Sequence, residues 1–138
     1  MATVTLNKDN FESTITDNDT VIVDFWASWC GPCMQFGPVY EAASEEYGDI
    51  VFGKVDTEDQ QELAQSFNIR SIPTLMVFRD NVLLFNQPGA LPKEMFVDLI
   101  GQVMELDMED VHKQIAEHAE EGHQHAEGEH EHAEADSA

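Results

Sequence analysis

The sequence is poor in basic residues and has no long apolar run. Six lysines and arginines stand against 28 aspartates and glutamates, and the formal net charge is −22. This charge argues against nucleic acid as a partner, because phosphates would repel the chain. No apolar run approaches the ~20 residues that a membrane-spanning helix needs, so we expect no membrane segment. The N-terminal residues lack the pattern of a signal peptide, and we expect a cytoplasmic protein.

Cysteine is almost absent as well. The only two, Cys30 and Cys33, lie in the sequence Trp29-Cys30-Gly31-Pro32-Cys33. Thiols this close cannot staple a fold, so the chain must be stable without disulfides. They can close a small disulfide ring, which indicates a reversible two-electron redox centre. A structural zinc site needs four ligands, and no histidine precedes His112, so we favour the redox pair over zinc.

Apolar patterning predicts strands that alternate with helices. The run 21–26 is nearly all apolar, as expected of a central strand covered on both faces. Asn7 can cap the first helix, and Asp80 and Asn81 suit a hairpin turn. We predict an α/β fold, with a central mixed β-sheet flanked by helices on both faces. The expected strands are 3–6, 21–26, 51–55, 74–78 and 82–85, and the expected helices are 8–15, 32–47, 60–67 and one that begins at Pro92.

The C-terminal region changes character. The apolar stripe of the last helix continues through Met108, Val111 and Ile115, which predicts that 107–118 extends this helix. Residues 119–138 contain seven acids and no base. Such a segment buries too little apolar surface to offset its ordering entropy. We therefore predict a domain over 1–106, a helical extension over 107–118 and a disordered acidic tail over 119–138.

Histidines recur in this tail among carboxylates, and two interpretations stay open. Neutral imidazoles beside carboxylates can bind Zn²⁺, Ni²⁺ or Cu²⁺ weakly. The tail can equally be a solubilising acidic segment that contains histidines. No metal ligand is therefore assigned firmly, and the weak candidates are His118, His123, His125, His130 and His132.

The two cysteines are expected to have different roles. Cys30 precedes the helix that begins at Pro32, where backbone N–H groups and the helix dipole favour a thiolate. Cys33 lies one turn inside and should be more buried. We therefore expect Cys30 to attack a disulfide and Cys33 to resolve the mixed disulfide. Asp24, inside the apolar strand, is costly to bury unless it is partnered or protonated, although it could also be a partly wet strand-end residue.

The order of elements, the Trp-Cys-Gly-Pro-Cys motif and Ile72-Pro73-Thr74 downstream together resemble thioredoxin, over residues 3 to 106. Five further positions match the family: Asp24, Trp26, Pro38, Lys54 and Gly89. The resemblance implies a thioredoxin fold and protein-disulfide reductase activity. It also implies that Asp24 and Lys54 lie beneath the disulfide, where the carboxylate assists proton removal from the resolving thiol.

The resemblance further implies a substrate surface and partners. Thioredoxins have a cis peptide at the position of Ile72–Pro73, beside the disulfide. Substrates would be disulfide-containing proteins, the electron donor would be an NADPH-dependent thioredoxin reductase, and no cofactor would bind a chain that we expect to be monomeric. The expected substrate-binding residues are Trp29, Gly31, Pro32, Ile72, Pro73, Gly89 and Ala90.

Three departures from the family bear on partner choice, and one alternative function remains. Met34 stands where many relatives have lysine, Ser71 where glycine is common, and Pro88 where an aliphatic residue is typical. The alternative is a metal-binding or scaffold protein in which the thioredoxin-like domain displays the histidine- and glutamate-containing tail.

Overall fold

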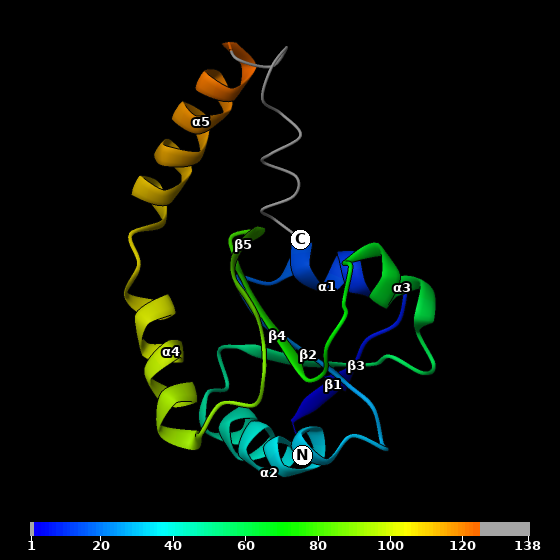
Figure 1. The fold of residues 1–138 in the computed structure, drawn as a ribbon. Helices are drawn as coiled ribbons and strands as arrows, with labels where there is room; N and C mark the ends of the chain where they lie inside the picture. The colour runs from blue at the N-terminus through cyan, green and yellow to red at the C-terminus, as the bar shows by residue number, and fades with distance from the viewer. Residues whose placement is uncertain (1, 125–138) are drawn as a thin grey trace. The chain divides into compact units, whose positions relative to one another are not determined.

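The structure, a computed structural model, describes residues 2–124. The chain divides into two units, Met1–Met104 and Glu105–Ala138. Within the first unit a five-stranded sheet has the order β1-β3-β2-β4-β5 (Figure 1). The strands are β1 (Thr3–Thr5), β2 (Thr20–Trp26), β3 (Val51–Asp56), β4 (Thr74–Arg79) and β5 (Val82–Pro88).

The sheet is mixed, as the sequence predicts. β1, β3 and β2 are parallel, whereas β4 runs antiparallel to β2 and pairs with β5 in a hairpin. Six of the seven residues of β2 are buried, which confirms its prediction as a central strand. Asp80 and Asn81 both have positive φ, of 53° and 65°, as a two-residue hairpin turn requires.

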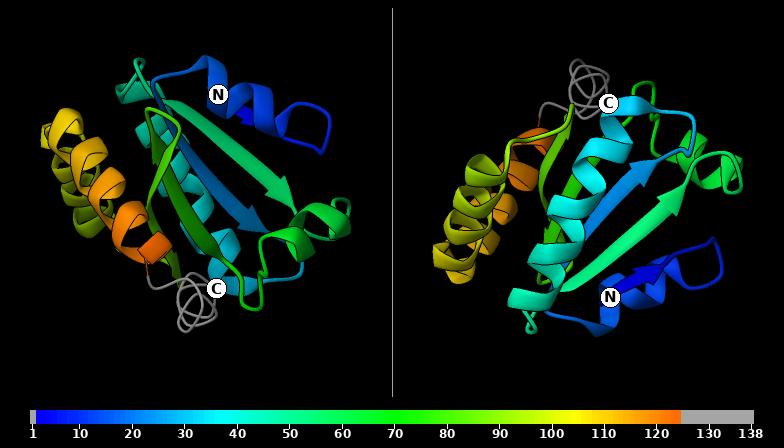
Figure 2. Two further views of the ribbon diagram at one scale, coloured as in Figure 1. Left: turned by 90° about the horizontal axis from the view of Figure 1, so that it is seen from above. Right: turned by 90° about the horizontal axis from the view of Figure 1, so that it is seen from below.

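Helices cover both faces of this sheet (Figure 2). On one face Phe36 and Tyr40 of α2 and Phe96 of α4 pack with Ile22 and Phe52 of the sheet. The other face is covered by α1 and α3, whose Phe11 and Leu63 pack against alternate residues of β2, β3 and β4. The helices are α1 (Phe11–Asp17), α2 (Gly31–Glu46), α3 (Gln61–Ser66), α4 (Lys93–Glu105) and α5 (Met108–Gln124).

Helix α1 starts later than the expected 8–15. The side chain of Asn7 accepts the backbone N–H groups of Asp9 and Asn10, at 2.8 and 3.0 Å, and so holds a turn rather than the helix start. Its backbone carbonyl accepts the N–H of Phe11, the first helical residue. The Asn7 side chain thus binds nearby backbone N–H groups that would otherwise lack partners. With these groups satisfied, the chain can form a turn here instead of starting the helix.

The expected continuous helix from Pro92 through 107–118 is also wrong, because two separate helices occupy this stretch. Arg79 of β4 donates to the carbonyl oxygens of Val103 and Met104, at 2.8 and 3.3 Å, near the end of α4. In the second unit the Asp107 carboxylate accepts the backbone N–H groups of Glu109 and Asp110, at 3.1 and 3.3 Å, and starts α5.

The predicted disordered tail, 119–138, begins inside α5, which extends to Gln124. The remainder of that predicted tail, 125–138, lies outside the described residues. Among the residues described, none of the helices has the length and apolar character that crossing a bilayer would require.

Tyr40 offers a test of the core. Its side chain is fully buried, and its hydroxyl lies 2.9 Å from the carbonyl oxygen of Ile22 and 2.7 Å from that of Gly53. We expect Tyr40→Phe to lower the free energy of unfolding by about 1 kcal/mol, because one buried hydrogen bond is lost while the ring is kept. Urea denaturation with an unchanged m-value would measure this. Equal or higher stability would contradict the assigned role of the hydroxyl.

Candidate active site

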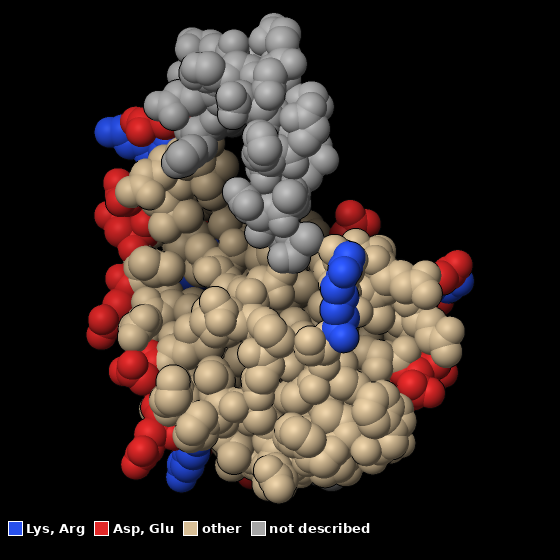
Figure 3. Space-filling model, viewed as in Figure 1, with Lys and Arg blue, Asp and Glu red and all other residues tan. Residues whose placement is uncertain are grey.

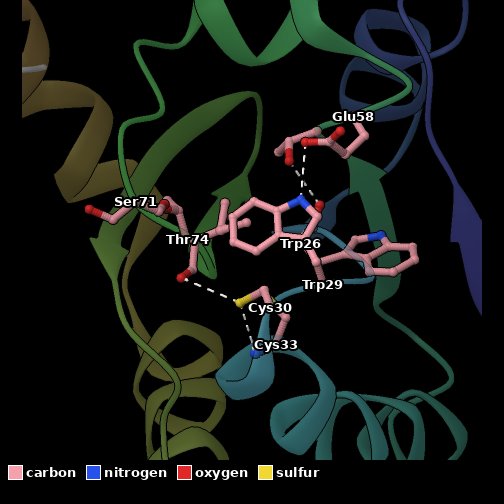
Figure 4. Close-up of a disulfide and its surroundings, with 9 residues drawn as sticks. Trp26, Trp29, Cys30, Cys33, Glu58, Ser71 and Thr74 are labelled. Atoms are coloured by element: carbon pink, nitrogen blue, oxygen red, sulfur yellow. Dashed lines mark hydrogen bonds between the residues drawn. A yellow bond between two sulfur atoms is a disulfide. The ribbon is translucent and has the colours of Figure 1, made fainter.

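The cysteine motif lies where β2 passes into α2. Cys30 is the N-cap of α2, Gly31 and Pro32 form its first turn, and the disulfide joins Cys30 to Cys33. Proline fits here because the first turn of a helix leaves its N–H groups without helical partners. The sulfur of Cys30 accepts the backbone N–H of Cys33 at 3.2 Å (Figure 4). The fold thus places Cys30 at the positive end of a helix dipole.

Exposure separates the two cysteines little, since Cys30 is 5% and Cys33 is 3% exposed with the disulfide closed. Their hydrogen-bonding environments differ more. The N–H of Cys33 points at the sulfur of Cys30, which favours negative charge on that sulfur once the disulfide is reduced. The same sulfur lies 3.7 Å from the carbonyl oxygen of Ile72. Cys30 therefore has the environment of a nucleophile.

The loop before β4 lies against the disulfide. Ile72 and Trp26 pack on a small cluster of Ala27, Cys30 and Cys33. The Ile72–Pro73 peptide bond is cis, which confirms the prediction. The carbonyl oxygen of Pro73 accepts the N–H of Gly89 at 2.7 Å, which joins this loop to the end of β5.

Exposed apolar and small residues surround the disulfide. Trp29 is 68% exposed, and its indole N–H donates to a carboxylate oxygen of Glu58 at 3.1 Å. Of the expected substrate-binding residues, Gly31, Pro32, Gly89 and Ala90 are exposed, Ile72 is half-buried and Pro73 is buried. Pro73 thus shapes the surface more than it contributes area to it. Figure 3 shows acidic residues along α4, along α5 and beside α3, whereas the surface between α2 and α3 is mostly uncharged.

Asp24 is 1% exposed, and its Oδ1 has no hydrogen-bond partner among the described residues. Burial raises the pKa of Asp24 to about 7 from an ordinary 3.8, and the positive charge of Lys54 opposes part of that rise. Lys54 is the register partner of Asp24 across the parallel pair β2 and β3. The structure thus brings together the two charged residues that the sequence singles out, and rules out a wet strand-end position for Asp24.

The surroundings of Lys54 include groups that the sequence analysis missed. Its ammonium lies 4.8 Å from the centre of the Trp26 ring and 3.8 Å from a carboxylate oxygen of Glu41. Glu41 lies on α2 and Trp26 on β2. Nothing in the helical pattern of α2 distinguishes Glu41 from the solvent-facing acids Glu45 and Glu46. Likewise, nothing in the sequence around Glu58 indicates that it accepts the indole N–H of Trp29.

The candidate metal ligands are not tested by the structure. His118, His123, His125, His130 and His132 lie outside the residues whose side chains are described. Within the part of the chain that is described, no group of three or more histidine, cysteine, aspartate or glutamate side chains is placed to hold a metal ion.

Comparison with known proteins places this geometry in a family. The model of the family "Thioredoxin" matches residues 2–102. The chain is 61% identical over 116 residues to "Putative thioredoxin 2" of Streptomyces coelicolor, and this match covers 84% of this chain and 87% of that protein. It is 41% identical over 95 residues to "Thioredoxin" of Chlorobaculum thiosulfatiphilum, covering 67% and 88%.

Solved structures agree with these sequence relatives. A thioredoxin of Plasmodium falciparum superposes with a TM-score of 0.67 at 36% identity, covering 72% of this chain and 97% of that one. A mutant thioredoxin of Halobacterium salinarum superposes with a TM-score of 0.69 at 32% identity, covering 75% and 92%.

Proposed function

Because this chain belongs to the thioredoxin family and is a thiol–disulfide oxidoreductase of that type, we propose distinct roles for the residues around its redox-active disulfide. Thioredoxins reduce disulfides through the cysteine pair itself and bind no cofactor. The observation that carries the proposal is Cys30 as the N-cap of α2, with the Cys33 N–H aimed at its sulfur.

In the proposed reaction the Cys30 thiolate attacks one sulfur of a substrate disulfide. A mixed disulfide forms, and the other substrate sulfur leaves as a thiolate that takes a proton from solvent. Cys33 then passes its proton to Asp24 and attacks the sulfur of Cys30, which releases the second substrate thiolate. Asp24 gives this proton up to solvent and the released thiolate takes one from solvent, so that Asp24 is ionised again for the next cycle. The substrate gains two electrons and two protons, and Cys30 and Cys33 become a disulfide.

Asp24 suits the role of proton acceptor. With a pKa near 7, its carboxyl can both accept and release a proton at neutral pH. Asp24 must be ionised before it can accept a proton, and burial opposes its ionisation. The positive charge of Lys54 on the neighbouring strand favours the ionised form.

The surface beside the disulfide would bind an extended segment of the substrate. Trp29, Gly31, Pro32, Ile72, Pro73, Gly89 and Ala90 would form this surface. The Ile72 carbonyl oxygen, 3.7 Å from the Cys30 sulfur, would fix the substrate backbone beside the nucleophile. Substrates would therefore be proteins with accessible disulfides in flexible segments.

The proposed electron donor is an NADPH-dependent thioredoxin reductase, and the protein would act as a cytoplasmic monomer. To test the donor, the full chain is mixed with insulin, NADPH and thioredoxin reductase from Streptomyces coelicolor, and absorbance at 340 nm is followed. We expect NADPH oxidation that depends on all components. If dithiothreitol supports insulin reduction but NADPH with reductase does not, the donor assignment is wrong while the exchange chemistry stands.

A further inference from the structure

Lys54 lies between two carboxylates. Its backbone pairs with Asp24 of β2 on one side of β3, and its ammonium lies 3.8 Å from Oε2 of Glu41 on α2. Asp24 is buried, whereas the side chains of Lys54 and Glu41 are each 23% exposed. The single cation can therefore be drawn toward the interior by Asp24 or toward the rim of the sheet by Glu41.

The position of Glu41 is fixed by more than this ion pair. Its Oε2 also accepts the hydroxyl of Thr3 at 2.9 Å, which ties α2 to β1. Its Oε1 is buried and has no hydrogen-bond partner among the described residues. A carboxylate held this way, mostly out of water, acts on a nearby cation more strongly than a fully solvated surface acid would.

The Trp26 ring is another neighbour of the Lys54 ammonium, whose nitrogen lies 4.8 Å from the ring centre. Trp26 and Glu41 both attract the ammonium. Among the described side chains, Lys54 and Asp24 form no ion pair within 4.0 Å. We propose that Glu41 is a positioning residue for the exchange reaction: it holds Lys54 at this intermediate location and so determines the pH at which Asp24 changes protonation.

This inference rests on the proposed proton transfer to Asp24 for its functional meaning, although its electrostatic content can be tested separately. Few other charged groups influence the protonation of Asp24. The charged or titratable side chains that act on Asp24 are Lys54 from β3 and Tyr40 from α2, and in the proposed reaction the reduced Cys33 thiol of α2 as well. Glu41 acts on Tyr40 and pairs with Lys54. β4 places Leu75 opposite Asp24, and α4 contributes Phe96 and Ile100 to the core on this face, all of them uncharged.

The direction of the effect follows from the charges. Without the negative charge of Glu41, the Lys54 ammonium is free to approach Asp24. This approach favours the ionised form of Asp24. We therefore expect Glu41→Gln to move the titration midpoint of Asp24 downward by about one pH unit. The substitution keeps the size of the side chain and its ability to accept the Thr3 hydroxyl.

The experiment measures the Asp24 carboxyl directly, by its ¹³C chemical shift in the full-length reduced protein from pH 4 to 10. Glu46→Gln, at the exposed end of the same helix, is the matched control with the same change in net charge, and should leave the midpoint within about 0.2 units. Lys54→Met should raise the midpoint. In the Lys54→Met background, Glu41→Gln should shift it far less, because its effect acts through Lys54.

An unmoved midpoint in Glu41→Gln, or an equal shift in Glu46→Gln, would overturn the inference. A full shift in the Lys54→Met background would also overturn it, since Glu41 would then act directly. The pH dependence of insulin reduction separates this from the proposed function. If the midpoint moves and the acidic limb of the rate profile moves with it, both stand. If the midpoint moves but the rate profile does not, Glu41 does control Asp24, and the proton-acceptor role of Asp24 is wrong.

Discussion

Cys30→Ser should lower the rate of insulin reduction on the order of 10³-fold or more, because serine offers no thiolate to attack the substrate disulfide. Cys33→Ser should fail differently. Cys30 would still attack, but nothing would resolve the mixed disulfide, and the protein would stay joined to its substrate. The two variants would thus share a loss of turnover while only Cys33→Ser accumulates a covalent complex.

Intact-mass spectrometry under non-reducing conditions measures the complex, and added dithiothreitol should release it. An independent check is limiting iodoacetamide at neutral pH on the reduced wild-type protein, which should label Cys30 before Cys33. A stable adduct with Cys30→Ser, or first labelling at Cys33, would show that the two cysteines have the opposite roles.

Asp24→Asn should change both stability and rate, and pH separates the two effects. In the folded protein the pKa of Asp24 is raised from 3.8 to about 7. Below about pH 3 the carboxyl is almost fully protonated in both folded and unfolded chains. As the pH rises from about 4 to 7 the unfolded chain ionises first, so the wild type loses stability. The loss approaches 4 kcal/mol at pH 8, roughly three pKa units at 1.36 kcal/mol each.

The asparagine variant lacks this loss. Its stability relative to the wild type should therefore rise by about 3.5 kcal/mol between pH 4 and pH 8, as measured by urea denaturation at both pH values. Asp49→Asn, at an exposed position, is the matched control and should show no such trend. The buried amide keeps a desolvation cost of its own, so the difference between the two pH values is the more informative quantity.

The same substitution should slow the step in which Cys33 loses its proton by about 10²-fold at pH 7, the usual size of a general-base contribution. The deficit should shrink toward pH 9, where the thiol ionises without help. Stopped-flow measurement of mixed-disulfide resolution would test this. A rate like that of the wild type from pH 6 to 9 would show that Asp24 is only a buried structural residue.

Some features of the fold follow from local chemistry. A run as nearly apolar as 21–26 favours a central strand covered on both faces, and β2 is indeed buried along nearly its whole length. Proline two residues after Cys30 suits a first helical turn, and α2 begins there. The boundaries were less predictable. Asn7 can cap a helix or hold a turn with similar hydrogen bonds, and only the surrounding structure selects the turn.

By itself the sequence determined the redox chemistry and the general architecture, since two thiols at this spacing before a helix start, and apolar runs of strand and helix length, leave few alternatives. Only the tertiary structure decided which charges surround Asp24 and Trp29. Glu41 meets Thr3 across 38 positions of the chain, and Glu58 meets Trp29 across 29. Such contacts depend on how strands and helices pack together. In the sequence, an acidic residue that makes such a contact has the same local pattern of neighbours as an acidic residue that faces water.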